Sequence, residues 1–308
     1  MKKTLLAFFT FFAFLPTVFA QDPDSANYWN WGGAGTINVG QVALTNWAAG
    51  GQSSINVLGL ASLFANYKRG TSAWDNTLNI NYGGNKTGKD KFRKNDDKLE
   101  LNAKYGRHAF GKWYYAGQFN LKTQLTPTFY KDTDSVISDF LSPAFILTSV
   151  GLDYRPNEDF SLFISPATGK FTYVKSQRLA DAGAFGVEPG KLNKDGFRIP
   201  NTGERFREEI GAYLAIRLRR DVMENIKLQS RLELYSSYNN NPSNIDVNWE
   251  NRLDMKVNKF ISVSLITELI YDDDIDVPLD RDEDGKPDGS GPRVQFKETL
   301  GVGLSYKF

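Results

Sequence analysis

The C-terminal stretch from Val294 to Phe308 reads VQFKETLGVGLSYKF. Seven of its eight even-numbered residues are apolar, the exception being Glu298, and none of its odd-numbered residues is a large apolar residue. Side chains alternate between the two faces of a β-strand, so a period of two indicates a strand with one apolar and one polar face. The stretch therefore predicts a long two-faced strand that ends with the chain.

The same alternation recurs upstream in segments of about 12 to 15 residues, which is longer than most strands of globular proteins and long enough to cross a bilayer at a tilt. The connections between segments are alternately short and long, as in transmembrane barrels. The sequence thus predicts an all-β chain, an antiparallel up-and-down transmembrane β-barrel of about 12 strands. The predicted strands lie near residues 34–46, 52–67, 72–84, 97–107, 112–125, 144–155, 159–175, 206–219, 224–238, 244–257, 260–271 and 293–307.

The composition excludes several other classes of protein. The 308 residues carry a net charge of +1, contain no Cys and contain one His. Disulfide scaffolds, thiolate metal sites and sites with several histidines are therefore excluded, and the charge balance gives no reason to expect nucleic acid as a partner. A mean hydropathy of -0.43 is too polar for a bundle of membrane helices.

The first twenty residues have the features of an export signal. Two lysines precede the apolar run Leu5–Leu15, and Val18–Ala20 resembles a small-x-small cleavage site. The apolar run is too short to cross a hydrocarbon core, which takes about 20 residues. We therefore expect a signal peptide at residues 1–20, cleavage near Ala20, and a barrel domain at residues 21–308 in the outer membrane, with both termini in the periplasm.

Aromatic residues concentrate near the ends of the predicted strands, where the girdles of a membrane barrel meet the lipid headgroups. Trp249 is an exception and falls in the middle of a strand. The residues expected at the girdles are Trp29, Trp31, Trp47, Tyr67, Trp74, Tyr82, Tyr105, Trp113, Tyr154, Tyr238, Tyr271, Tyr306 and Phe308.

The polar faces of the strands between residues 206 and 257 carry charges of both signs, which predicts a lattice of ion pairs across neighbouring strands. Barrels of about 8 strands are filled by side chains, whereas those with about 16 to 18 enclose a channel. Because twelve strands lie between these cases, we expect a narrow or plugged lumen and not an open general porin. The predicted lattice comprises Arg207, Glu209, Arg217, Arg219, Lys227, Arg231, Glu233, Asp246, Glu250, Arg252, Asp254 and Lys256.

An acidic loop at residues 272–292 resembles part of a calcium-binding loop. Its aspartates follow the alternating spacing of such loops, and Gly285 permits the sharp turn. Position twelve is Gly291, so the bidentate glutamate of an EF-hand is missing. The loop is either a weak calcium site or a solvated acidic segment, and its candidate ligands are Asp280, Asp282, Asp284 and Asp288. We expect no other cofactor.

The only imidazole is that of His108, which falls in the predicted short turn from Arg107 to Gly111. No nucleophile or orienting acid is placed beside it, and a barrel enzyme acting on lipid needs its base at the opposite end. The sequence also contains no phosphate-binding loop, no G-x-S-x-G motif and no metalloprotease helix. These observations predict that the protein is not an enzyme.

Several stretches together resemble the uncharacterised Bacteroidota outer-membrane β-barrel family, domain of unknown function 3078. They are Asn46-Trp47 with Gly50-Gly51, Trp74–Leu78 with Tyr82-Gly83, Ser138–Pro143, Leu162–Lys170, Asn244–Glu250 and Phe296–Phe308. The resemblance implies an outer-membrane barrel and no activity. The residues Leu304, Tyr306 and Phe308 also look like the signal that the barrel-assembly machinery recognises, and the terminal Phe308 predicts that the chain is complete.

Three functions remain open at this point. The first is a narrow or plugged channel, or a structural subunit of an envelope complex. The second is an enzyme that modifies lipid or lipopolysaccharide, and the third is a surface barrel whose long loops bind calcium or another ligand. The expected partners are outer-membrane lipid and lipopolysaccharide, the assembly machinery during biogenesis, and subunits of an envelope complex. The long connection from Ser176 to Arg205 either folds into the lumen or acts as a lid over a binding site.

Overall fold

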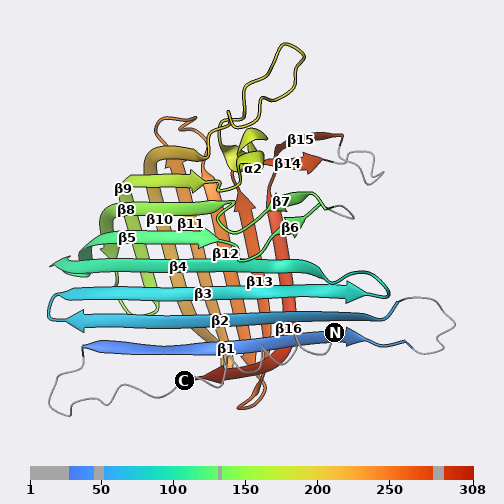
Figure 1. Ribbon diagram of the computed structural model, residues 1–308. Helices are drawn as coiled ribbons and strands as arrows, with labels where there is room; N and C mark the ends of the chain where they lie inside the picture. Colours follow the sequence, from blue (N-terminus) through green and yellow to red (C-terminus); the bar gives the residue numbers. More distant parts are fainter. Residues whose placement is uncertain (1–27, 45–51, 131–133, 280–287) are drawn as a thin grey trace.

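The computed structural model describes residues 28–44, 52–130, 134–279 and 288–308. Twelve antiparallel strands close into a single barrel (Figure 1). The predicted signal peptide and Trp47 lie outside the described residues. Going around the barrel, the strands follow the order β1-β16-β13-β12-β11-β10-β9-β8-β5-β4-β3-β2.

The barrel strands match the predicted number and, within a few residues, the predicted positions. The fold class is therefore confirmed. The strands are β1 (Trp29–Val42), β2 (Ser54–Arg69), β3 (Ser72–Thr87), β4 (Arg93–Phe110), β5 (Trp113–Thr123), β8 (Ala144–Tyr154), β9 (Phe160–Tyr173), β10 (Phe206–Met223), β11 (Ile226–Ser237), β12 (Asp246–Lys256), β13 (Ile261–Tyr271) and β16 (Gln295–Lys307).

Two strands begin earlier than predicted because their backbones pair beyond the predicted start. β1 begins five residues before the predicted start, since Trp29 pairs with Tyr67 of β2. β4 begins at Arg93, which pairs with Asn85 after a register shift at Gly83 and Gly84. The added part of β4, which begins Arg93-Lys94-Asn95-Asp96, shows no alternation. The added part of β1 alternates at Trp29-Asn30-Trp31 and loses the pattern at Gly32 and Gly33.

The remaining elements belong to long connections. A hairpin of β6 (Thr128–Phe129) and β7 (Val136–Ser138) follows β5, and a second hairpin of β14 (Asp276–Leu279) and β15 (Gly289–Pro292) follows β13. The short helices α2 (Gln177–Asp181) and η2 (Ala184–Gly186) lie between β9 and β10. Figure 1 shows these elements gathered at one end of the barrel. We call this the loop end, and the opposite end the turn end.

Short turns connect consecutive strands at the turn end. Gly70 and Gly111 stand in two of these turns with φ of 56° and 55°. Such left-handed backbone is easily accessible to glycine, because a Cβ atom would crowd the carbonyl oxygen. The first residue of β1 and Phe308 also lie at this end, where Gly33 and Phe308 exchange two backbone hydrogen bonds of 3.1 Å.

The apolar faces of the strands point outward and the polar faces point into the lumen. On β16, Leu300 and Leu304 are each 64% exposed, and Val150 of β8 is 69% exposed. The polar residues Asn38, Glu100 and Asn120 are instead buried inside. No helix among the described residues is long and apolar enough to cross a membrane.

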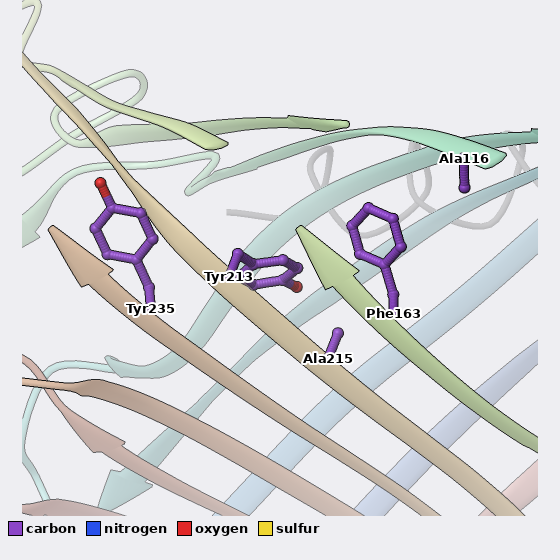
Figure 2. Close-up of a cluster of buried hydrophobic side chains, with 5 residues drawn as sticks. All are labelled: Ala116, Phe163, Tyr213, Ala215 and Tyr235. Atoms are coloured by element: carbon purple, nitrogen blue, oxygen red, sulfur yellow. The ribbon is translucent and has the colours of Figure 1, made fainter. Parts of the chain in front are cut away.

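Two small apolar clusters are buried. One lies on the inner wall of the barrel and is shown in Figure 2; it consists of Ala116, Phe163, Tyr213, Ala215 and Tyr235. The other holds the α2 segment together and consists of Val174, Leu179, Ala180 and Val187, with Ala184 and Phe185 packed against it. The long connection after β9 therefore has a core of its own and is folded at the loop end.

Candidate functional site

Charged side chains from opposite walls meet in the middle of the lumen. Arg231 of β11 donates to both carboxylate oxygens of Glu100 of β4, at 2.7 and 3.2 Å. Lys98 of β4 reaches Glu250 of β12 at 2.8 Å, and Lys122 of β5 reaches Glu233 of β11 at 3.1 Å. We call these six residues the luminal bridge: Lys98, Glu100, Lys122, Arg231, Glu233 and Glu250.

The strand order shows that the bridge crosses the lumen. β4 and β12 are six strands apart in a barrel of twelve, so they stand on opposite walls. β4 and β11 are five strands apart, and β5 and β11 are four apart. The pairs thus join walls that share no backbone hydrogen bonds, and the side chains themselves span the lumen.

The centre of the bridge is buried, and its carboxylates accept several hydrogen bonds each. The side chain of Glu100 is 1% exposed, and that of Arg231 is 16% exposed. The amide of Asn120 donates to Glu100 at 3.1 Å, and the hydroxyl of Tyr213 donates to Glu233 at 2.8 Å. Charges that are taken out of water remain favourable only when their partners and hydrogen bonds compensate the lost hydration, and here each carboxylate has more than one donor.

Only part of the predicted lattice contributes to the bridge. Arg231, Glu233 and Glu250 belong to it, whereas Arg252 pairs with Asp254 at 2.9 Å along its own strand. Near the turn end, Lys227 pairs with Asp221 at 3.3 Å. Three predicted members have no ion pair among the described residues: Arg217, Arg219 and Lys256.

A cavity of about 520 Å³ lies above the bridge, toward the loop end. Its lining residues come from the loop-end portions of the strands and from the loops, as with Thr128 and Ile275. Lys98, Lys122 and Glu233 of the bridge also line it, so the bridge separates the cavity from the turn end. Part of the wall is apolar or aromatic, and the residues of this kind include Phe145, Leu147, Tyr213, Tyr235, Ile270 and Tyr271.

Ion pairs link the loops to the barrel beside this cavity. The ammonium of Lys170 on β9 contacts Asp246 at 2.6 Å and Asp272 at 2.9 Å. The guanidinium of Arg207 on β10 contacts Asp274 at 2.5 Å and donates to the Gly186 carbonyl at 3.1 Å. The predicted residue Arg207, together with Lys170, therefore holds the segment after β13 and the η2 segment over the lumen. The predicted residue Asp246 joins β12 to β9 through Lys170.

The α2 connection is further held by one carboxylate. Asp181 accepts hydrogen bonds from the Gln177 amide at 3.0 Å and from the backbone N–H groups of Asn201 and Gly203 at 2.9 and 2.8 Å. Hydrogen bonds to the charged form favour ionisation. Those from Gln177, Asn201 and Gly203 lower the pKa of Asp181. The charge on this carboxylate thus holds the two halves of the connection together.

A second group of charges lies below the bridge, nearer the turn end. Lys104 of β4 contacts the buried Asp153 of β8 at 3.0 Å. Arg155, just after β8, contacts both Asp153 and Asp75, the latter at 2.8 Å. This group was not among the predicted site residues.

The calcium hypothesis concerns residues that are mostly undescribed. Asp280, Asp282 and Asp284 lie outside the described residues, and Asp288 stands immediately before β15. Among the described residues, no three His, Cys, Asp or Glu side chains are grouped so that they could hold a metal ion. Calcium binding by this loop therefore stays a prediction.

The outward face at the turn end carries the predicted assembly signal and a cluster of aromatic rings. Leu304 and Tyr306 are each 64% exposed, and Phe308 is 57% exposed. The rings of Tyr306 and Phe308 stack at 6.3 Å, and those of Trp113 and Tyr154 lie 5.0 Å apart. An apolar and aromatic band thus surrounds this end of the barrel.

His108 lies near the turn end, though within β4 and not in the turn itself. A register shift between His108 and Phe110 extends the pairing of β4 with β5, so the turn is shorter than predicted. One ring nitrogen of His108 lies 3.2 Å from the Gly111 carbonyl oxygen, and the ring packs edge-on to Tyr114. The lining of the loop-end cavity does not include this residue.

The sequence predicted the bridge residues on β11 and β12 and did not predict those on β4 and β5. Lys98, Glu100 and Lys122 occupy the polar face of strands that alternate as clearly as β10 to β12. Their alternation was a sufficient signal for an inward position. Pairing across the lumen depends on the closure and tilt of the barrel, which the sequence pattern does not contain.

The fold and the site together define a class of protein. It is a closed twelve-stranded antiparallel barrel with an apolar outer face and with ion pairs that cross its lumen. Residues 39–129 match the model of a family described as protein of unknown function DUF3078. This match agrees with the resemblance seen in the sequence and extends from the end of β1 to β6; the resembling stretches from Ser138 onward lie beyond it. No protein of curated function matches the sequence.

Solved structures of several outer-membrane proteins are similar to the chain. An outer membrane channel of Pseudomonas putida F1 is 11% identical with a TM-score of 0.39, over 93% of this chain and 100% of that one. The NanC porin is 9% identical with a TM-score of 0.39, over 90% and 100%. The translocator domain of the autotransporter NalP from Neisseria meningitidis is 10% identical with a TM-score of 0.35, over 93% and 90%.

Proposed function

We propose that this chain is an outer-membrane barrel with a lumen closed to free diffusion and a cavity at its loop end that receives a small ligand. The observation that carries the proposal is the luminal bridge, in which Glu100 and Arg231 join opposite halves of the barrel at 2.7 Å. An open porin keeps an aqueous channel between its walls, whereas here charged side chains occupy the middle of the lumen.

The outer face supports a position in the membrane. Large apolar side chains are exposed on the outer face of most barrel strands, and Val150 and Leu300 are more than half exposed. Continuous apolar surface of this kind is unfavourable in water and favourable against lipid. Closure of the sheet also gives every barrel strand a paired neighbour on each side, as suits the interior of a bilayer. Outer-membrane lipid and lipopolysaccharide are accordingly the proposed neighbours of this face.

The lengths of the connections support an orientation. Membrane barrels have short periplasmic turns and longer extracellular loops. We infer that the turn end, with both ends of the barrel sequence, faces the periplasm and that the α2 segment faces the exterior. The exposed Leu304, Tyr306 and Phe308 at the turn end are then available to the assembly machinery during biogenesis.

The cavity supports the binding of a ligand in preference to the passage of a solute through the barrel. Its volume of about 520 Å³ is in the range of small-molecule sites. One part of its lining is apolar, including Leu147 and Tyr235, and another part is charged, including Asp246 and Lys170. A ligand with an apolar body and polar or charged groups suits such a lining, and a non-enzymatic role is part of the proposal.

Two measurements test this function. Cell fractionation should place the protein in the outer membrane, with a mobility on gels that changes on boiling; a soluble protein with unchanged mobility would overturn the membrane position. Proteoliposomes that contain the folded protein should then resist swelling in small neutral sugars. Swelling at the rate of a general porin would contradict the closed lumen.

A further inference from the structure

Two arginines share one row on the outer face of the barrel at the turn end. Arg69 is the last residue of β2, and Arg107 lies near the end of β4. Both pair in register with Ser72, the first residue of β3, which lies between them. Because neighbouring strands lie about 4.8 Å apart, the two arginine backbones are about 10 Å apart. We call Arg69, Ser72 and Arg107 the arginine row.

The arginine row points away from the lumen. Alternate residues of a strand share a face, and Tyr105, two residues before Arg107, is 48% exposed. Tyr115, which pairs with Arg107 from β5, is 63% exposed. The hydroxyl of Tyr105 donates to that of Ser72 at 3.1 Å, so Ser72 lies on the same side. Arg69 shares this face because it pairs directly with Ser72.

Within the described part of the chain, no carboxylate forms an ion pair with the arginine row. Arg69 and Arg107 are both exposed. The guanidinium of Arg69 lies 4.9 Å from the ring centre of Tyr28, and a cation over a ring face is held by the ring quadrupole. Lys112, in the turn after β4, is also exposed and adds positive charge. The row therefore presents two guanidinium groups to an anion from outside the protein.

A row of aromatic rings lies next to the arginine row, on the side toward the middle of the barrel. Trp29, Tyr67, Trp74 and Tyr105 are in register with one another across β1 to β4. The ring of Trp29 lies 5.3 Å from that of Tyr67 and 6.0 Å from that of Trp74. Trp and Tyr concentrate where a membrane barrel meets the lipid headgroups. In a membrane, the arginine row would therefore stand at the level of the headgroups.

A hollow in the outer wall begins at these aromatic rings. Its volume is about 690 Å³, and Trp74 and Tyr105 line the end that lies beside the arginine row. From there it crosses β5 and β8 and reaches β9 and β10, strands that are adjacent in the barrel (Figure 1). We call this hollow the outer groove. Its middle is formed by small residues with larger apolar ones beside them: Ala103, Gly117, Ala167, Gly169, Phe119 and Val150.

The arginine row and the outer groove together fit a lipid with an anionic head. Guanidinium groups bind phosphate oxygens through charge-assisted hydrogen bonds, and an acyl chain suits an apolar groove that faces the bilayer. We propose that this part of the outer face binds an anionic glycerophospholipid, with its phosphate at the arginine row and one acyl chain in the outer groove. The proposal rests on the membrane position and orientation inferred above, which place the turn end in the periplasmic leaflet, away from lipopolysaccharide.

Native mass spectrometry of the folded protein in detergent, with dioleoyl phosphatidylglycerol as the probe, tests the headgroup site. We expect saturable binding of one lipid, weakened about tenfold or more when Arg69→Gln and Arg107→Gln are combined, because charge-assisted hydrogen bonds are lost. Arg219→Gln with Arg220→Gln is the matched control, since it removes the same charge at the turn end of β10, four strands from β4. Its affinity should equal that of the wild type, and equal affinities of the two double variants would overturn the proposal.

The outer groove is tested by filling it. Ala167→Phe places a ring in the groove and should weaken the binding of the same lipid about tenfold, as the loss of about two buried methylene groups would. Leu300→Phe is the control, since it adds a ring to the outer face on β16, five strands from β9. An affinity of Ala167→Phe equal to that of this control would show that no acyl chain occupies the groove.

A further measurement uses the wild-type protein alone. Phenylglyoxal modifies exposed guanidinium groups, and mass spectrometry of peptides reports each arginine separately. Phosphatidylglycerol should slow the modification of Arg69 and Arg107 and leave that of Arg220 unchanged. Unchanged rates at Arg69 and Arg107, or stronger protection by lipid A than by phosphatidylglycerol, would contradict a phospholipid site. A protein that fractionates with the outer membrane but binds no phosphatidylglycerol would overturn this proposal and leave the proposed function standing.

Discussion

At the scale of single residues, Glu100 is the centre of the luminal bridge. Its carboxylate accepts two hydrogen bonds from Arg231 and one from Asn120, and Lys98 lies 3.5 Å away. The side chain is 1% exposed. Removing one partner from such a buried network leaves the other charges without compensation, which costs more than the network contributes in net stability.

Replacing Glu100 by Gln should therefore destabilise the barrel strongly. The amide keeps the shape but removes the carboxylate nearest to the guanidinium of Arg231, which then keeps only the longer contacts with Glu250 at 3.2 Å and Glu233 at 3.9 Å. We expect a loss of about 3–5 kcal/mol in the free energy of unfolding. The measurement is the denaturant midpoint of folded protein in detergent, followed by the heat-sensitive gel mobility.

The matched control is Glu224→Gln, which makes the same chemical change at an exposed position in the turn between β10 and β11. Its midpoint should stay within about 0.5 kcal/mol of the wild type. Equal midpoints for the two variants would show that Glu100 has no special part in holding the walls together.

Half of the bridge residues could be predicted from the sequence of their own strands. The inward positions of Arg231, Glu233 and Glu250 follow from alternation, and so does the presence of both charge signs. Their partners Lys98 and Lys122 lie more than one hundred residues away along the chain. Because contact across the lumen depends on strand tilt and side-chain length, local alternation could not identify them.

At the scale of elements, the α2 connection is a folded segment fastened by Asp181. Its pKa is lowered by hydrogen bonds from Gln177, Asn201 and Gly203. A carboxyl whose pKa is lower in the folded state than the unfolded value of about 3.9 stabilises the fold above that value. This stabilisation is lost as the pH falls through the lowered pKa, so the connection should loosen in acid.

Asp181→Asn should loosen the same connection at neutral pH. The neutral amide is a weaker acceptor for the N–H groups of Asn201 and Gly203. We expect faster tryptic cleavage within residues 176–205 while the barrel itself remains intact. Asp195→Asn, in an exposed position of the same connection, is the control and should be cleaved at the wild-type rate; equal rates for both variants would contradict the role of Asp181.

The bulge between β8 and β9 depends on Gly151. The register shifts there, and a Cβ atom at Gly151 would collide with the carbonyl oxygen of Ile164. Gly151→Ala should lower the unfolding free energy by about 1–3 kcal/mol because the strands must separate to admit the methyl group. Gly117→Ala is the control, since its nearest neighbour would be Ser149 O at 3.9 Å; a midpoint for Gly151→Ala equal to that of the control would contradict the close approach.

At the scale of the whole molecule, the barrel follows from the period of two, and the described chain confirms the twelve predicted strands. The strand number and the two faces could be predicted because alternation and connection length are local properties. The fold of the long connections could not. Their small cores, as at Val174 and Leu179, form between residues with no repeating pattern.

The proposed orientation can be tested with single cysteines, because the natural chain contains none. Lys194→Cys lies in the connection that contains α2, and Lys259→Cys lies in the turn between β12 and β13. A membrane-impermeant maleimide added to intact cells should label Lys194→Cys only. Lys259→Cys should become reactive after the outer membrane is permeabilised, and the reverse pattern would invert the orientation.

The central claim is that the charged bridge closes the lumen, and electrical conductance in a planar bilayer tests it most directly. We expect no discrete open steps from the wild-type protein, because Arg231 and Glu100 join opposite walls. A variant with Lys98, Glu100 and Arg231 all replaced by Ala removes side chains of both signs and should show steps if it folds. Stable open steps from the wild type, of the same size as those of that variant, would contradict the closed lumen.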